Sequence, residues 1–261
     1  MKYLDPNALE QLPGKQIHPG ETFHFRCHTN IACFNQCCRN LNLFLYPFDV
    51  LRLKQRLNMS SDAFIDRYVN IIMREGHHFP EVLLRMDDQH DSACPFVTAD
   101  GCRIYEDRPH TCRIFPLEQG ALYNAGSNTT TPVYIFRPPE FCKGPEEDHP
   151  LTLDDWTRDQ GADIYSQMTL RWANVRRLFQ NNPWGSEGFE GAKGRMAFMA
   201  AYNIDRFREF VFNSTFIKRY RIKPKLVKQL HATDKALLSF AFEWIEFFVW
   251  GRPSKHIRSK K

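Results

Sequence analysis

No uninterrupted apolar run in this chain of 261 residues approaches about 18 residues, so the sequence predicts no membrane span. The first residues, Met1 to Pro6, also lack the apolar stretch of a secretory signal, which favours a cytoplasmic location. The sequence contains no GxSxG, GxxxxGK[ST] or HExxH pattern. These absences argue against a serine hydrolase, a P-loop enzyme and a zincin protease.

The sequence has little net charge, with 35 Lys and Arg against 30 Asp and Glu and a formal charge of +5. The last eleven residues contain five of these cations and no acid, so the rest of the chain is balanced. This distribution favours a short exposed tail, with an electrostatic tether to phosphate or acidic lipid as the alternative. It predicts no global basic face and no specific nucleic-acid partner.

Cysteine is absent from the last 119 residues but clustered before them. The eight cysteines are Cys27, Cys33, Cys37, Cys38, Cys94, Cys102, Cys112 and Cys142. Disulfides suit small secreted domains better than a chain of this length, and independent core thiols do not explain four cysteines within twelve positions. The pattern therefore favours metal or iron–sulfur ligation, with all eight thiols as candidate ligands.

The spacing within the first cysteine segment is unusual. Cys27-x5-Cys33-x3-Cys37-Cys38 differs from the paired C-x2-C knuckle of common zinc sites and from the C-x3-C-x2-C run of radical enzymes that use S-adenosylmethionine. In extended backbone, Cys37 and Cys38 would point to opposite faces, so we expect them to serve different centres. Eight thiols then fit two four-ligand sites, or one cluster and a second metal.

A cation directly follows four of the cysteines. These cations are Arg39, Arg103, Arg113 and Lys143. Because a four-thiolate centre is anionic, neighbouring cations and backbone N–H groups would offset its charge and lower the thiol pKa values. This favours thiolates over inert thiols. Tyr105 and His110 lie near cysteines in the sequence and are candidate partners of thiolate sulfur.

Three stretches of the sequence carry a recognisable pattern. They are Phe25-Arg26-Cys27 through Cys38, then Cys94-Pro95-Phe96 with Gly101-Cys102-Arg103-Ile104-Tyr105, and Arg108-Pro109-His110-Thr111-Cys112-Arg113-Ile114-Phe115-Pro116, closed by Cys142-Lys143-Gly144. Together they resemble the CxxCxxCC cysteine-cluster family, also called the YkgJ family, over about residues 20 to 150. The resemblance implies a zinc- or iron-chelating or iron–sulfur protein, whose cofactor is an iron–sulfur cluster, of the [4Fe–4S] type, or Zn²⁺.

Three functions are compatible with these features. We expect a metal-binding protein that holds an iron–sulfur cluster, zinc or both, without an assigned reaction. One branch of similar proteins comprises bacterial flagellin lysine methylases, so the resemblance also suggests a protein lysine N-methylase-like enzyme. The third interpretation is an interaction or assembly protein whose metal is purely structural. The sequence singles out no catalytic residue.

The hydrophobic periodicity predicts an α+β protein that is predominantly helical. An acidic segment at 144–150 suggests a boundary, with a cysteine-cluster metal-binding unit over 1–150 and a helical unit with a basic tail over 151–261. We expect helices from Pro47, from Ser60 or Ser61 through Ile72, and over about 153–180, 193–218 and 233–250. A helical turn should begin at Pro109, and short strands should lie at 82–86, 121–123 and 132–136.

The expected helix over 233–250 is rich in aromatic residues. These are Phe240, Phe242, Trp244, Phe247, Phe248 and Trp250. Glu243 and Glu246 interrupt the apolar sequence, which argues against a membrane span. Core packing is one interpretation of the aromatic residues, and a docking face for a protein partner is the other.

Overall fold

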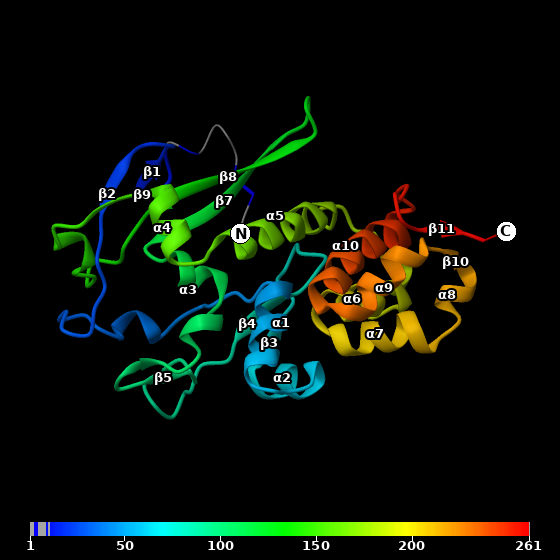
Figure 1. The fold of residues 1–261 in the computed structure, drawn as a ribbon, viewed down its shortest axis with the longest axis horizontal. Helices are drawn as coiled ribbons and strands as arrows, with labels where there is room; N and C mark the ends of the chain where they lie inside the picture. The colour runs from blue at the N-terminus through cyan, green and yellow to red at the C-terminus, as the bar shows by residue number, and fades with distance from the viewer. Residues whose placement is uncertain (1–2, 5–8, 10, 261) are drawn as a thin grey trace. The chain divides into compact units, whose positions relative to one another are not determined.

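The structure, a computed structural model, describes residues 3–4, 9 and 11–260, and the chain forms two compact units (Figure 1). Unit 1 comprises residues 1–45 and 83–173, and unit 2 comprises residues 46–82 and 174–261. The described residues form ten α-helices and small antiparallel sheets, which confirms the α+β, predominantly helical prediction. The predicted boundary near residue 150 follows chain order, whereas each unit combines two separate segments. That boundary stays a prediction.

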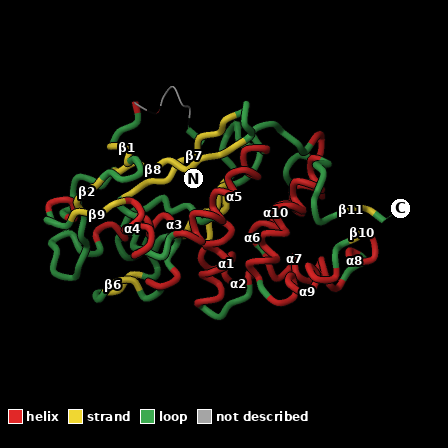
Figure 2. The backbone as a smooth tube through the Cα atoms, turned by 45° about the horizontal axis from the view of Figure 1, so that its top comes forward, coloured by secondary structure: helices red, strands yellow, loops and turns green. Residues whose placement is uncertain are grey.

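The largest sheet of unit 1 has three strands in the order β1–β8–β7. β1 is Lys15–Ile17, β7 is Leu117–Asn124 and β8 is Thr129–Phe136, and both pairings are antiparallel. Figure 2 shows these strands in yellow. The strands predicted at 121–123 and 132–136 both lie within the β7–β8 hairpin, which extends further than the sequence pattern suggested.

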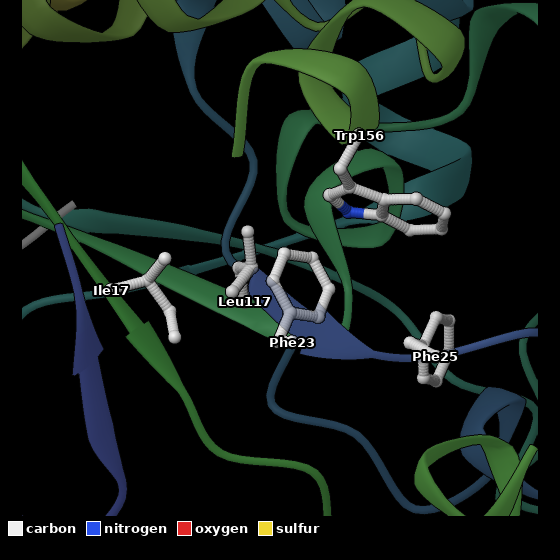
Figure 3. Close-up of a cluster of buried hydrophobic side chains, with 5 residues drawn as sticks. All are labelled: Ile17, Phe23, Phe25, Leu117 and Trp156. Atoms are coloured by element: carbon white, nitrogen blue, oxygen red, sulfur yellow. The ribbon is translucent and has the colours of Figure 1, made fainter. Parts of the chain in front are cut away.

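A second pairing in unit 1 joins residues far apart in the sequence. β2 (Thr22–His24) runs antiparallel to β9 (Pro150–Thr152), with Phe23 opposite Leu151. Next to this pair lies a core cluster (Figure 3) of Ile17, Phe23, Phe25, Leu117 and Trp156. The pairing therefore fixes the chain just before the first cysteine against the chain just after the last one.

α4 (Leu153–Asp159) begins after a capping residue, Thr152. Thr152 accepts a hydrogen bond from the backbone N–H of Asp155, at 3.1 Å, and its hydroxyl donates to the Asp155 carboxylate. The sequence predicted one helix over about 153–180, but α4 ends at Asp159 and α5 spans Asp163–Leu178. Gly161, at a φ of 57°, lies between them, and this left-handed conformation interrupts the helix.

Short elements carry most of the cysteine segments of unit 1. They are the 3₁₀ helices η2 (Gln36–Cys38), η3 (Tyr105–Asp107) and η4 (Gly144–Glu146), the strands β5 (Val97–Thr98) and β6 (Gly101–Cys102), and the helix α3 (His110–Ile114). The N-cap of α3 is Pro109, which confirms the predicted helical turn. Such short elements cannot stabilise themselves, so contacts across unit 1 must hold the cysteine segments.

Helices dominate unit 2. They are α1 (Pro47–Arg56), α2 (Ser61–Tyr68), α6 (Ala192–Tyr202), α7 (Ile204–Asn213), α8 (Phe216–Arg219), α9 (Pro224–Ala232) and α10 (Asp234–Trp250). α10 packs against α1, α6, α7 and α9. Pro47 is the first residue of α1, and Ser60 caps α2 by accepting from the backbone N–H of Ala63, both as predicted. Among the described residues, no helix is long and apolar enough to cross a membrane.

Several boundaries in unit 2 differ from the prediction. α2 ends at Tyr68 instead of reaching Ile72, and β3 (Val69–Ile72) follows because β-branched side chains favour extended backbone. The helix predicted over 193–218 is divided into α6, α7 and α8, and the Asn203 side chain caps α7. α9 was not predicted. β4 (Glu81–Leu84) lies close to the strand predicted at 82–86.

The aromatic residues of α10 pack within unit 2. Phe240, Phe242 and Trp244 are buried, and the Trp244 ring lies 4.9 Å from Phe216 and 5.2 Å from Tyr220 between ring centroids. Core packing therefore explains this helix, and these contacts give no support to a docking face on it.

Candidate metal centre

All eight cysteines lie in unit 1, and all are free thiols. Cys27 is exposed, Cys33 is buried, and the other six are partly buried. The structure arranges their thiols in two groups of four. One group combines three cysteines of the first segment with one that follows much later in the sequence, and the other combines one with three.

The first group surrounds a pocket. The pocket is lined by Cys27, Cys33, Cys37 and Cys142, together with Phe25, Ile31, Phe115, Phe141 and Gly144. Although Cys27 is exposed as a residue, burial of its thiol and the neighbouring thiols of Cys37, Cys33 and Cys142 raise its pKa to about 11. The thiols of Cys33, Cys37 and Cys142 thus lie close enough to Cys27 to affect its ionisation.

Backbone contacts hold Cys142 against the first segment. The backbone N–H of Lys143 donates to Cys33 Sγ at 3.2 Å, and the N–H of Arg26 donates to the Gly144 carbonyl at 3.1 Å. Gly144 packs so tightly on the Phe25 ring that a Cβ at this position would overlap it. The β2–β9 pairing brings the two ends together, and these contacts fix their register.

The second group contains Cys38, Cys94, Cys102 and Cys112. The backbone N–H of Cys94 donates to the carbonyl of Cys38 at 2.8 Å. The β5–β6 hairpin turns the chain back, so that Cys102 pairs with Val97 in the strand that follows Cys94. The thiols of Cys112 and Cys94 both contribute to a raised pKa of Cys38, after its hydrogen bond to Cys37 and burial.

The adjacent Cys37 and Cys38 belong to different groups, but their backbone is not extended. Both lie in the 3₁₀ helix η2, and the thiol of Cys38 donates a hydrogen bond to Cys37. This bond lowers the pKa of Cys37 to about 7. The expectation that the two side chains point to opposite faces is therefore wrong. Their thiols touch, and the two groups meet at this contact.

Backbone N–H groups are directed at several sulfur atoms. Burial raises the pKa of Cys94, Cys102 and Cys142, whereas hydrogen bonds from backbone N–H groups lower it. The donors are Phe96 and Val97 to Cys94, Ile104 to Cys102, and Gly144 to Cys142. Such donors favour the thiolate form, which is the form that binds metal.

The four cations that follow cysteines in the sequence have different environments. Arg103 lies over the Phe96 ring, at 5.3 Å from its centroid, and its charge favours the thiolate forms of Cys94 and Cys102. Arg39 pairs with Asp91 at 3.5 Å, and the Lys143 ammonium pairs with Glu146 at 2.7 Å. The carboxylates partly neutralise these two cations.

Arg113 is buried, and its guanidinium binds backbone. It donates to the carbonyl oxygens of Gln160, at 2.5 Å, and Glu106, at 2.6 Å, and lies over the Tyr165 ring. Replacing Arg113 would leave two carbonyl groups without these donors. Arg113 therefore has a structural role in holding α3, in addition to the charge that the sequence suggested.

Arg108 is a further buried cation that the sequence analysis did not single out. Its guanidinium lies 3.7 Å from the centroid of the Tyr105 ring and donates to the Tyr105 carbonyl at 2.6 Å. Its charge favours the thiolate form of Cys102. The Arg-Pro dipeptide before α3 could have indicated this role of Arg108. Pro109 caps the helix, so the side chain of the residue before it lies beside the cysteines.

The two candidate partners of thiolate sulfur, Tyr105 and His110, both make contacts with other groups. Tyr105 is exposed and stacks with Arg108. His110 is buried, and its Nε2 lies within hydrogen-bond distance of Gln119 Oε1, which in turn is part of β7. Burial lowers the pKa of His110 to about 4, so the imidazole is neutral. His110 thus links α3 to the sheet.

The thiols lie in two groups, but within each group they do not converge on a single point. Over residues 3–4, 9 and 11–260, no three or more His, Cys, Asp or Glu side chains already converge tightly enough to hold a metal ion. The donor set is nevertheless chemically selective. Soft thiolates suit zinc and iron–sulfur clusters, and they are poor ligands for magnesium or calcium.

Comparison with known proteins agrees with this chemistry. Residues 26–145 match the family model CxxCxxCC, described as "Putative zinc- or iron-chelating domain". The match covers every one of the eight cysteines and confirms the resemblance that their spacing suggested. No curated protein and no solved structure matches the chain. Metal binding by this cysteine-rich domain is therefore supported, with zinc or iron as the metal.

Proposed function

We propose that the zinc- or iron-chelating domain at residues 26–145 binds metal at two adjacent four-thiolate centres. Centre A consists of Cys27, Cys33, Cys37 and Cys142. Centre B consists of Cys38, Cys94, Cys102 and Cys112. The observation that carries the proposal is the grouping itself, because in both centres thiols from distant segments approach closely enough to alter one another's pKa.

The surroundings of the thiols support ligation over simple burial. A structural core cysteine needs no hydrogen-bond donor, whereas backbone N–H groups are directed at Cys33, Cys94, Cys102 and Cys142. Burial raises the pKa of most of these thiols, so a bound metal would have to displace their protons. The N–H donors and the charges of Arg103 and Arg108 would then stabilise the thiolates in place of those protons.

For centre A we propose an iron–sulfur cluster in preference to a single zinc ion. Its four thiols line a pocket instead of meeting at one point, and Phe25, Phe115 and Phe141 give that pocket apolar walls. A zinc ion needs its sulfur ligands at about 2.3 Å, so the thiols would have to close the pocket completely. A polynuclear cluster requires less closure, and it supplies reversible one-electron chemistry when bound.

Metal and sulfide analysis of protein purified without oxygen tests the proposal. Iron and acid-labile sulfide in similar amounts, with an electron paramagnetic resonance signal after reduction, are the expected result. Zinc without sulfide would refute the iron–sulfur assignment and keep the thiolate centres. Protein that takes up neither metal when its thiols are reduced would refute metal binding altogether.

A further inference from the structure

Two segments of unit 2 are basic and contain no acid. Residues 210–233 carry six cations, Lys218, Arg219, Arg221, Lys223, Lys225 and Lys228. The C-terminal residues after Glu246 carry further cations, including Lys255, Arg258 and Lys260. We call these nine residues the basic surface. All nine are exposed.

The fold brings the two segments together. β10 (Tyr220–Arg221) pairs antiparallel with β11 (Arg258–Ser259), and this places Arg221 directly opposite Arg258. The backbone N–H of Lys260 donates to the Arg219 carbonyl at 2.8 Å. Figure 1 shows α8, β10 and β11 next to one another near the C-terminus.

This arrangement opposes the usual electrostatics of a strand pair. Like charges directly opposite each other on paired strands are destabilising. The pair is held instead by buried apolar side chains: Ile257 is 1% exposed, and Tyr220 packs on Trp244. Packing within unit 2 thus offsets the repulsion between these positive charges.

Nearby acids do not neutralise the basic surface. Among the described residues, none of the nine cations forms an ion pair within 4.0 Å. The Glu243 carboxylate binds Ser254 and His256, and Glu246 pairs with Arg252 at 3.6 Å. The positive charge of the surface is therefore available to an anionic partner.

The start of α9 adds backbone donors to this charge. Lys223 is its N-cap, and neither a side-chain cap nor an acidic residue occupies the first turn. Lys225 and Lys228 are three positions apart and share one face of the helix. The nine residues of α9 extend over about 13 Å, a distance along which duplex DNA carries about eight phosphate charges.

We propose that the basic surface binds the phosphodiester backbone of double-stranded nucleic acid without reading its sequence. The exposed large apolar residues of the described chain are Ile71, Ile72, Met73, Tyr105 and Phe141, and all lie outside residues 218–260. The surface thus offers neither an apolar anchor for a lipid bilayer nor an aromatic platform for unpaired bases. Cations alone suit a regular array of phosphates, and this binding is independent of the metal centres.

Fluorescence anisotropy of the full chain with labelled duplexes of random sequence, one of DNA and one of RNA, tests this inference. We expect affinity to fall steeply between about 50 and 200 mM salt, because each phosphate contact contributes about −0.9 to the slope of log K against log salt for B-DNA. The triple substitution Lys218→Gln, Lys225→Gln and Lys228→Gln should reduce the steepness of the DNA slope by about 2.7.

A matched variant removes the same number of lysines elsewhere. Lys15→Gln, Lys193→Gln and Lys235→Gln lie outside the basic surface and should leave the slope unchanged. Equal effects of the two triple variants would refute the assignment of the surface, provided that both retain the thermal unfolding temperature of the unmodified chain. Failure of that chain to bind either duplex, or binding to phosphatidylserine vesicles alone, would refute the choice of nucleic acid.

Discussion

Replacing Gly144 by alanine should weaken centre A without touching a cysteine. The new Cβ would overlap Cε2 of the Phe25 ring, and it would lie 2.7 Å from Cδ2 and 3.1 Å from the Arg26 carbonyl oxygen. Phe25 is 1% exposed and packs edge-on against Phe115 and Trp156, so its ring has little room to move. The residues around Gly144 must shift instead.

The cost can be estimated from the packing. Overfilling a packed core costs about 1–3 kcal/mol. If about 2 kcal/mol of this is relieved by moving residues 142–144 away from the first segment, metal binding at centre A should weaken about 30-fold. The contact between Lys143 N–H and Cys33 Sγ would be lost in the same movement.

Metal retention during titration with a competing chelator measures this effect. Gly126→Ala is the matched control, because Gly126 is exposed in the turn of the β7–β8 hairpin and has only the side chain of Asn124 nearby. We expect Gly144→Ala to lose part of its metal at lower chelator concentration, and Gly126→Ala to behave as the unmodified chain. Identical retention in all three proteins would show that the Gly144–Phe25 contact does not position centre A.

Other substitutions probe charge, ligand identity and stability. Arg103→Gln should keep its metal at neutral pH but release metal from centre B at a higher pH during acid titration, because the Arg103 charge favours the thiolate forms of Cys94 and Cys102. Cys37→Ser and Cys38→Ser should lose different spectroscopic signals, and loss of one common signal would contradict two centres. Asp205→Asn should destabilise unit 2 by about 2–3 kcal/mol in thermal or chemical unfolding, since the buried Lys54 ammonium, 2.7 Å from Asp205, would lose its partner. Burial raises the pKa of Asp205, but hydrogen bonds from Lys54 and Ser61 hold that pKa below its ordinary value of 3.8. The difference in stability between Asp205→Asn and the unmodified chain should therefore shrink as pH falls below 3.8, where the carboxylate takes up a proton.

The chemistry of the candidate site could be predicted from sequence because it depends on residue type. Eight clustered cysteines, four of them directly followed by a cation, point to soft-metal ligation wherever the fold places them. The arrangement of the thiols in two groups could not be predicted. It depends on the β2–β9 pairing and on hydrogen bonds such as that from Lys143 N–H to Cys33, which join residues more than 100 positions apart.

The backbone conformation at Cys37 and Cys38 is a second feature that could not be predicted from the sequence. Alternation of side chains follows only if the backbone is extended, and nothing in the residue pair itself requires that. In the structure Asn35 adopts a left-handed conformation, with a φ of 63°, and starts the 3₁₀ helix that brings the two thiols together. Asparagine tolerates this conformation better than most residues, so it was the one local signal for the turn.

The basic surface was missed for a different reason. The chain before the last eleven residues has equal numbers of cations and acids, so its net charge gives no sign of the six cations of residues 218–228. Those acids are distant in sequence, and the ones near the surface already have partners. Only the β10–β11 pairing shows that two modest basic segments form one surface.

Limited proteolysis with and without a chelator distinguishes the division of the chain into units 1 and 2 from a boundary at residue 150. The proposed centres A and B would tie together residues of unit 1 alone, so metal-binding energy should act as folding energy for residues 1–45 and 83–173. A boundary at residue 150 would instead expose the whole segment before it when metal is removed.

Residues 46–82 separate these possibilities, because they precede residue 150 but belong to unit 2, where α10 packs against α1. We expect new cleavage after metal removal at residues such as Arg103, and no increase within α1 or α2, as mapped by mass spectrometry of the fragments. New cuts throughout 46–82 would support the boundary at residue 150, and unchanged digestion would show that metal does not stabilise unit 1.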